Sequence, residues 1–241
     1  MVGAGMLGAA MVAAPRRWLS EGSAVTNRDE VSILAPDDAL AFQRLLTIYR
    51  EAIEPSEQKP ADEVAQISAD KRYVMIVSTD VQGVSGFAMV FCPPARSFWL
   101  LEYMAVRPHR RSQGLGRRLF LAAKGAAAMR CPGAPGLLEV DHPNAAVAPV
   151  NDPLRRLRLY RSLGCRRIEG LDYILPLRSA GPPPAMCLLV DGLEGQSFIA
   201  KAAVREWLTV IYTQVYRQPS NDKRIATMLQ PLKEACALSA P

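Results

Sequence analysis

The chain has 241 residues, of which 49% are hydrophobic and 22% are charged, so it can bury a sizeable core and is not disordered throughout. Its net charge of +6 suits an anionic small molecule or nucleic acid, or is only a basic surface, and charge alone does not choose between these. The five cysteines are odd in number, scattered, and show neither C-x-x-C spacing nor a nearby histidine. We therefore expect a reducing compartment and no metal site.

The first residues are expected to form an extension. Residues 1–14 are apolar and small, but no basic residue precedes them, and the run is too short to span a bilayer. We predict a flexible N-terminal extension over residues 1–30 rather than a targeting segment. Because no other apolar run reaches membrane-spanning length, we expect a cytoplasmic protein without a membrane partner.

The next part of the chain predicts an antiparallel meander. β-rich runs separated by turn and proline signals indicate strands, and the helical spacing after Asp37 or Asp38 indicates a capped helix. A turn is expected at Gln82-Gly83 and a break at Pro93-Pro94. The expected strands cover residues 31–34, 73–77, 84–91 and 98–106, and the expected helices residues 39–49 and 61–68.

The pattern changes after Arg107-Pro108. An Ala- and Leu-rich segment from Gly114 to Met129 predicts a helix, which Cys131-Pro132-Gly133 ends. The apolar run 137–140 predicts the following strand, parallel to its predecessor through a right-handed crossover. A sheet that begins antiparallel therefore acquires a parallel pair.

The last third predicts further strands and helices. Asp152 as N-cap, Pro153 and Gly164 bound a helix whose Leu154, Leu157, Tyr160 and Leu163 are expected to dock on the sheet. Residues 165–177 and 186–190 read as strands, with Pro182-Pro183-Pro184 in a stiff loop between them. Periodicity predicts a helix over 198–216 and another after Asp222. We expect one domain over residues 31–191 and a C-terminal helical extension over 192–241 packed on it.

The segment between the strand 98–106 and the helix after it carries the chemistry. It runs through basic residues and two glycines, Gly114 and Gly116. A helix start leaves backbone N–H groups unpaired and can hold a pyrophosphate if no side chain blocks the approach. The spacing matches neither a P-loop nor a Rossmann fingerprint. A different phosphate ligand is implied.

Arg111-x-x-Gly114-x-Gly116 resembles the signature of the GNAT superfamily of N-acetyltransferases, and the order of elements over residues 31–191 is similar as well. The resemblance implies an α/β fold with a mixed, mostly antiparallel sheet, a central splayed parallel strand pair and flanking helices. It implies that acetyl-CoA, or another acyl-CoA, is the co-substrate. The residues implied to hold its pyrophosphate are Arg111, Ser112, Gln113, Gly114, Leu115, Gly116 and Arg117, and those implied to pair with its pantetheine arm are Met104, Ala105 and Val106.

A second segment, Tyr160 to Cys165, resembles the family's Tyr-x-x-x-Gly-Phe motif with Cys in the last place. The resemblance implies that Tyr160 donates a proton to the departing thiolate. The alternative is a core tyrosine on an apolar helix face. The family's Asn seven residues earlier corresponds to Pro153, so that contact is absent or comes from Asn151.

Acylation needs a neutral amine, and a carboxylate is the natural base. Glu102 is the first candidate, because it precedes the residues expected to pair with the cofactor; a solvent-facing strand residue is the alternative. Glu139 on the neighbouring strand is the second candidate, and Asp141 and His142 follow it. A strand N–H of Met104 or Ala105 is expected to polarise the thioester carbonyl.

Other basic residues have two interpretations. Arg110, Arg117, Arg118 and Lys124 could meet the 3′-phosphate or form a solvated basic face. The arginines between 155 and 167 lack the aromatic interleaving of a nucleic-acid site. We interpret these arginines as surface charge and expect no nucleic acid partner.

The sequence thus favours an N-acyltransferase that moves an acetyl or other short acyl group from acyl-CoA to the amine of a small molecule or peptide, by direct transfer in a ternary complex. The alternatives are a non-catalytic acyl-CoA-binding regulatory module and, last, a basic nucleic-acid-associated protein. The acceptor is not identified. Its specificity is expected in the loop 54–60, the segment 143–149 and the terminal helices, which could also form a homodimer surface or a lid.

Overall fold

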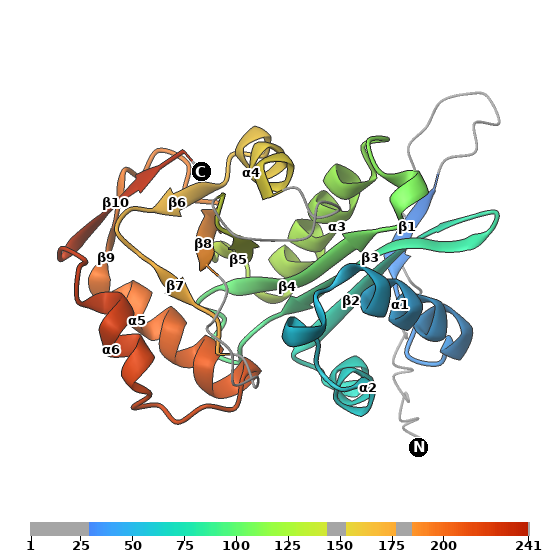
Figure 1. Ribbon diagram of the computed structural model, residues 1–241, viewed down its shortest axis with the longest axis horizontal. Coiled ribbons are helices and arrows are strands. Elements are labelled where there is room, and N and C mark those ends of the chain that lie inside the picture. The colour runs from blue at the N-terminus through green and yellow to red at the C-terminus, as the bar shows by residue number, and fades with distance from the viewer. Residues whose placement is uncertain (1–28, 144–152, 177–184, 241) are drawn as a thin grey trace, which may run out of the picture.

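The structure is a computed structural model that describes residues 29–143, 153–176 and 185–240. Within these ranges ten strands form one sheet in the order β1-β2-β3-β4-β5-β8-β6-β10-β9, with β7 pairing β8 (Figure 1). The strands are β1 (Glu30–Ile33), β2 (Tyr73–Asp80), β3 (Gly83–Phe91), β4 (Trp99–Val106), β5 (Gly136–Asp141), β6 (Arg166–Ile168), β7 (Tyr173–Ile174), β8 (Ala185–Asp191), β9 (Phe198–Ala200) and β10 (Ala235–Ser239).

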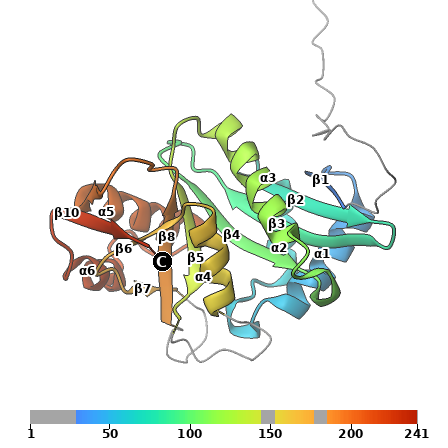
Figure 2. The ribbon, with the colours of Figure 1, turned by 90° about the horizontal axis from the view of Figure 1, so that it is seen from above.

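Helices cover both faces of this sheet. They are α1 (Ala39–Ala52), α2 (Ala61–Ala69), α3 (Leu115–Arg130), α4 (Pro153–Ser162), α5 (Lys201–Val210) and α6 (Lys223–Leu229), with short 3-10 helices η1 (Pro55–Glu57) and η2 (Pro108–Arg110) and a π-helical turn η3 (Ile211–Val215). The buried residues of α3 and α4 belong to one hydrophobic core and those of α1, α2, α5 and α6 to the other. Figure 2 shows α3 lying across β2, β3 and β4.

The alternation of side chains explains why both faces are buried. Tyr73, Met75 and Val77 of β2 enter one core, whereas Val74 and Ile76 enter the other. Successive side chains of a strand point to opposite faces, so a continuous apolar run fits a strand covered on both sides. The strand predicted over residues 73–77 is confirmed.

The central strands are arranged as expected. β2, β3 and β4 form antiparallel pairs, and β5 is parallel to β4 across α3. The fold is therefore a mixed, mostly antiparallel sheet flanked by helices, with one parallel pair, β4 and β5, among the described strands.

Two irregularities open the sheet at β4. Met89 of β3 lies opposite Tyr103 and Val90 opposite Leu101, so Glu102 is an extra, bulged residue. The parallel pairing of β4 with β5 ends at Leu101 and Leu138. Beyond that point the two strands separate, and the edge of β4 that faces β5 has no strand partner within the described ranges. The splayed parallel pair is confirmed.

Two predicted helix starts are also confirmed. The Asp38 carboxylate accepts a hydrogen bond from the Ala41 N–H at 2.9 Å, and the Asp222 carboxylate one from the Arg224 N–H at 2.9 Å. Side-chain oxygens at these positions satisfy N–H groups that have no partner inside the helix. The predicted cap at Asp152 and the prolines at 182–184 lie outside the described residues.

The C-terminal predictions are partly wrong. Phe198 begins β9, which pairs with the unpredicted strand β10, and the helix starts only at Lys201. Segment 165–177 forms two short strands, because Gly170, with a φ of 76°, turns the chain between them. Leu154, predicted to dock on the sheet, is 53% exposed. The first turn of α4 does not reach the sheet.

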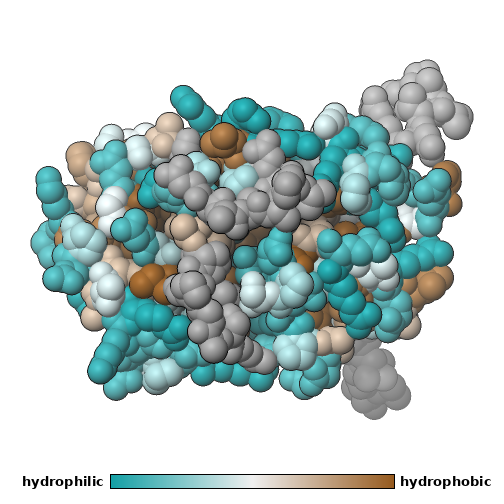
Figure 3. Space-filling view, in the orientation of Figure 1, coloured by the Kyte–Doolittle hydropathy of each residue, from teal (hydrophilic) through white to brown (hydrophobic). Residues whose placement is uncertain are grey.

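The surface carries no single dominant apolar area on the face that Figure 3 shows. Hydrophobic residues there are scattered among hydrophilic ones. The exposed large hydrophobic residues of the described chain come from separate elements, among them Leu40 of α1, Met129 of α3 and Phe198 of β9. Scattered exposed apolar residues are normal for a folded domain.

Candidate active site

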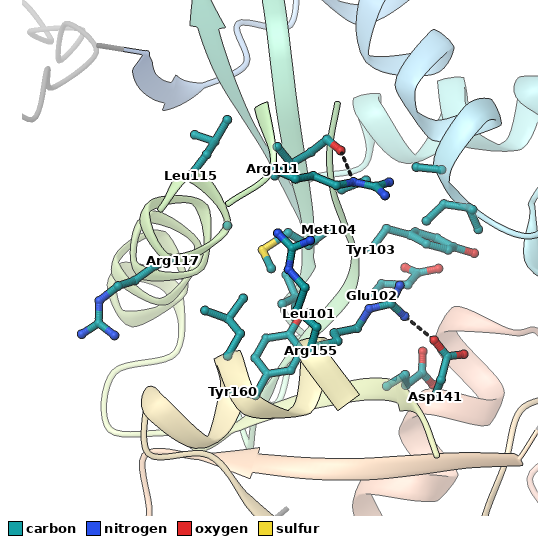
Figure 4. Close-up of a pocket in the computed structure, with 18 of the residues that line it drawn as sticks. Leu101, Glu102, Tyr103, Met104, Arg111, Leu115, Arg117, Asp141, Arg155 and Tyr160 are labelled. Carbon is teal, nitrogen blue, oxygen red and sulfur yellow. Dashed lines mark hydrogen bonds and ion pairs between the residues drawn. The ribbon is translucent and has the colours of Figure 1, made fainter. Parts of the chain in front are cut away.

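The site is a cavity of about 400 Å³ where β4 and β5 separate. Its lining comes from β4, β5, the start of α3, α4 and the segment from α1 to η1 (Figure 4). Elements from both halves of the chain therefore meet around the opening in the sheet.

The start of α3 contributes unpaired backbone N–H groups. The first backbone hydrogen bond of the helix runs from the Arg118 N–H to the Gly114 carbonyl at 3.1 Å. The N–H groups of Leu115, Gly116 and Arg117 precede it and have no acceptor four residues back. Gly114 has a φ of 77°, in the left-handed region, which glycine adopts without steric cost. The loop thus presents N–H groups at the positive end of the helix dipole.

Three arginines gather beside this loop. Arg111, Arg155 and Arg156 line the cavity, and Arg155 Nη2 donates a hydrogen bond to Ser112 Oγ at 3.0 Å. Burial, and then repulsion by Arg155 and Arg156, lowers the pKa of Arg111. An anion bound here would relieve that repulsion. The interpretation of Arg155 and Arg156 as surface charge is therefore wrong, because α4 turns both toward the cavity.

The free edge of β4 forms the floor of the opening. Met104, Ala105 and Val106 line the cavity and pair with β3 along their other edge. The Val106 carbonyl accepts a hydrogen bond from Arg111 Nε at 3.3 Å. An extended ligand could therefore hydrogen-bond to the backbone here as an added strand does.

Four carboxylates also line the cavity: Glu57, Glu102, Glu139 and Asp141. Glu102, at the bulge, has a side chain that is 1% exposed and forms an ion pair with Lys59 through Oε1. Its other oxygen, Oε2, has no hydrogen-bond partner among the described residues. The Lys59 ammonium lies over the Tyr216 ring, 4.9 Å from its centroid.

Glu139 of β5 is held by two tyrosines. The Tyr173 hydroxyl donates to Oε1, and the Tyr216 hydroxyl donates to Oε2 at 2.6 Å. Burial raises the pKa of Glu139 to about 7, although both hydrogen bonds oppose the rise; the charge of Glu102 adds to it and that of Lys59 reduces it. Glu139 is therefore a carboxyl group that titrates near neutral pH.

Glu57 and Asp141 form a second acidic group. Asp141 accepts a hydrogen bond from Arg156. Burial, and then repulsion by Asp141, raises the pKa of Glu57 to about 7. From the sequence, the loop 54–60 was expected only as a region of acceptor specificity, and Arg155 and Arg156 were interpreted as surface charge. No local pattern shows that these residues meet, since they lie on elements far apart in the chain.

Tyr160 has features of both predicted roles, a proton donor to the departing thiolate and a core tyrosine. Its side chain is buried in the core, with its ring 5.8 Å from that of Phe120 in an edge-on arrangement, and it also lines the cavity. Burial raises its pKa above the ordinary tyrosine value. The phenol therefore stays protonated and remains able to donate a proton.

Some predicted residues lie elsewhere. The Gln113 amide donates to the His109 carbonyl at 3.0 Å and does not line the cavity. The Arg117 side chain points away from the cavity (Figure 4), so only its backbone remains as a ligand. His142 does not line the cavity either. Asn151 lies outside the described residues.

The remaining basic candidates are engaged in ion pairs. Arg110 and Arg118 each lie 2.7 Å from Asp29 Oδ2, and Lys124 lies 2.9 Å from Asp191 Oδ2. These pairs fix the start of β1 and the end of β8 against the rest of the domain.

Within the described ranges, no helix has both the length and the apolar character needed to cross a membrane.

Comparison with known proteins agrees with this geometry. The family model described as the acetyltransferase (GNAT) domain matches residues 70–166. A GNAT-family protein from Bacteroides thetaiotaomicron superposes with a TM-score of 0.60 at 20% identity, over 78% of this chain and 98% of its own. None of the curated proteins compared with the chain matches it.

Two further solved structures are similar. An aminoglycoside 6′-N-acetyltransferase complexed with coenzyme A superposes with a TM-score of 0.52 at 17% identity, over 67% of this chain and 95% of its own. Ard1 from Thermoplasma volcanium does so with a TM-score of 0.51 at 17% identity, over 69% of this chain and 99% of its own. At these identities the likeness establishes the fold.

Proposed function

The chain carries a domain of the GNAT acetyltransferase superfamily, and on that basis we propose that it transfers an acyl group, most simply acetyl, from acyl-CoA to an amine. The observation that carries the proposal is the distribution of charge in the cavity. Arg111, Arg155 and the N–H groups at the start of α3 line the same cavity as four carboxylates, two of which, Glu102 and Asp141, are paired with Lys59 and Arg156. Such a cavity suits an anionic donor and a cationic acceptor that meet between them.

The donor end fits the phosphates of coenzyme A. The N–H groups of Leu115, Gly116 and Arg117 would hold the pyrophosphate, with Arg111 and Arg155 beside it. The free edge of β4 from Met104 to Val106 would pair with the amides of the pantetheine arm. Acyl-CoA, when bound, supplies the activated acyl group as a thioester.

The acceptor end fits an amine that arrives protonated. We assign the general base to Glu139, because a carboxyl group with a pKa of about 7 can take a proton from the attacking nitrogen near neutral pH. Glu102, the first candidate from sequence, is already paired with Lys59. We assign Glu102 the role of attracting the ammonium group to the bulge.

The remaining groups complete the transfer. A backbone N–H of Met104 or Ala105 would stabilise charge on the thioester oxygen. The ammonium first loses one proton to Glu139, which passes it to solvent, because only the neutral amine has a lone pair for the attack. As the C–N bond forms and the C–S bond breaks, Glu139 takes the second proton from the nitrogen and the Tyr160 hydroxyl donates one to the departing sulfur; the phenol then regains its proton from solvent. The products are an amide and free coenzyme A.

The test is acetyl transfer from acetyl-CoA to a panel of primary amines, measured as thiol release across the pH range. We expect kcat/KM to rise with pH through about 7, because Glu139 acts as a base only when deprotonated. Glu139→Gln should lower kcat/KM about 100-fold or more, and Glu206→Gln, an exposed carboxylate of α5, should not.

Each other outcome has a definite meaning. If Glu139→Gln had the same kcat/KM as the parent, Glu139 would not be the general base. Binding of acetyl-CoA without acylation of any amine would favour the alternative expected from the sequence, a non-catalytic acyl-CoA-binding module.

The cytoplasmic location stays a prediction; the five cysteines, all buried and free of disulfide bonds, are consistent with it.

A further inference from the structure

The carboxylates of the cavity form two separate groups, and this separation bears on the acceptor. We propose that the acceptor carries two cationic groups: the amine to be acylated, beside Glu139 and Glu102, and a second cation that binds Glu57. The inference rests on the proposed function and adds a substrate class to it, primary alkylamines with a second positive charge along the chain.

The first group lies at the bulge of β4. Glu102 lines the cavity although its side chain is almost fully buried, and its Oε2 atom has no hydrogen-bond partner among the described residues. A buried carboxylate oxygen left without a donor is costly. An ammonium group in the cavity would supply that donor and would stand beside the proposed base, Glu139.

The second group lies at the end of β5. The charges that act on Glu57 most strongly are those of Asp141 and Arg156, whereas those that act on Glu139 are Glu102 and Lys59. Arg156 is hydrogen-bonded to Asp141. Glu57 itself has no hydrogen-bond or ion-pair partner for its carboxylate among the described residues, although it lines the cavity.

The charges of both groups indicate two missing cations. Among the described residues, two basic side chains pair with these four carboxylates: Lys59 with Glu102 and Arg156 with Asp141. Burial leaves Glu57 and Glu139 each with a pKa of about 7, which means that neither is fully ionised at neutral pH while the cavity lacks cations. A monoamine can compensate one of these carboxylates, and a dication compensates both.

The cavity also has an apolar lining, which suits a hydrocarbon spacer. Ala52, Ile53 and Met186 line the same cavity as the carboxylates. A linear aliphatic chain would cover these apolar groups, and its two ends would reach the two acidic groups.

The test compares acetyl transfer to α,ω-diamines of increasing length with transfer to monoamines of matched length. A second arm uses short peptides with a free N-terminal amine. In one set the second residue is lysine, which adds a second positive charge, and in the matched set it is norleucine, which does not. This arm shows whether the two charges come from a peptide or from a free diamine. We expect kcat/KM to be at least about tenfold higher for dications of one preferred length than for the matched monoamines.

Variants of Glu57 sharpen this test. Glu57→Gln should remove the preference, because KM rises more for the dications than for the matched monoamines, while acetyl-CoA affinity stays as in the parent. The backbone carbonyl of Glu57, not its carboxylate, accepts the Tyr103 hydroxyl at 3.0 Å, so the substitution retains that anchor. Glu57→Asp should keep the preference and move it to a longer diamine, and Glu51→Gln, an exposed carboxylate at the end of α1, should change nothing.

Failures of the two proposals can be told apart. If monoamines react as well as every dication and Glu57→Gln has no effect, the two-charge acceptor is wrong while acyl transfer stands. If acetyl-CoA binds and no amine of either kind reacts, both are wrong.

Discussion

At the scale of single residues, the account depends on how Glu139 is held. Tyr173 and Tyr216 donate to its two oxygens from β7 and from the residue after η3. Hydrogen bonds to an ionised carboxylate favour that form, and burial disfavours it. The balance between the two sets the pH at which the proposed base becomes active.

Tyr216→Phe should therefore shift the pH profile. Loss of a hydrogen bond to a charged group, worth about 1.5 kcal/mol, should raise the pKa of Glu139 and move the midpoint of kcat/KM upward by about one pH unit. Tyr212→Phe is the matched control, since Tyr212 lies in η3 and donates to the Ile174 carbonyl instead. A midpoint that stays in place in Tyr216→Phe, while the overall rate falls, would mean that Tyr216 is only structural.

The sequence identified part of this site. Glu102 and Glu139 could be proposed because they lie on strands next to a recognisable phosphate loop. Tyr216 is hydrogen-bonded to Glu139 although the two residues are 77 positions apart in the sequence. Glu57 lies in a 3-10 turn whose position beside the cavity is set by tertiary packing. No periodicity or spacing links residues that only tertiary packing brings together.

At the scale of elements, the loop before α3 depends on the left-handed conformation of Gly114. A Cβ atom added at Gly114 would meet nothing within 4 Å, and the same is true of Gly133 after α3, whose φ is 72°. Both alanine variants should lose about 1–2 kcal/mol of stability from backbone strain, measured by urea unfolding.

Only one of the two variants should affect the ligand. Because Gly114 lines the cavity, its added methyl group would stand where a phosphate approaches. Gly114→Ala should bind acetyl-CoA several-fold more weakly, and Gly133→Ala should bind as the parent does. If the two variants bound acetyl-CoA with equal affinity, this loop would not be part of the donor site.

The junction of β4 and β5 is a second element with a definite test. A Cβ atom at Gly136 would lie 2.2 Å from Cζ2 of Trp99, its cross-strand partner. Gly136→Ala should displace the indole and lower the free energy of unfolding by about 1–3 kcal/mol. Gly125→Ala, in α3 with open space around it, should raise the free energy of unfolding by about 0.5–1 kcal/mol. If Gly136→Ala had the same free energy of unfolding as the parent, the Trp99 indole could move without loss of stability.

The elements themselves were predicted unevenly. Helices with capping aspartates and strands with continuous apolar runs were recognised, because their signals are local. Strand β10 was missed, and β9 was taken for the start of a helix, since the pairing of Cys236 with Ile199 joins segments distant in sequence. Strands stabilised by non-local pairing carry weaker local signals than helices.

At the scale of the whole molecule, the fold class follows from the sequence and the donor site stays a proposal, whereas the relation of the C-terminal segment to the rest could not be predicted. The division into a domain over 31–191 and an extension over 192–241 stays a prediction. Contacts that join these parts include the pairing of β10 with β6 and the hydrogen bond from the Tyr216 hydroxyl to Glu139 of β5. The C-terminal segment therefore helps to position Glu139, which lines the cavity.

The whole account depends on a donor site at the start of α3. The most direct measurement is calorimetric titration of acetyl-CoA into the parent protein, into Arg111→Ala and into Arg161→Ala, an exposed arginine of α4 that does not line the cavity. We predict a dissociation constant of micromolar order for the parent, about −8 kcal/mol, at least tenfold weaker binding for Arg111→Ala, and parent-like binding for Arg161→Ala. No binding to the folded parent would contradict the account.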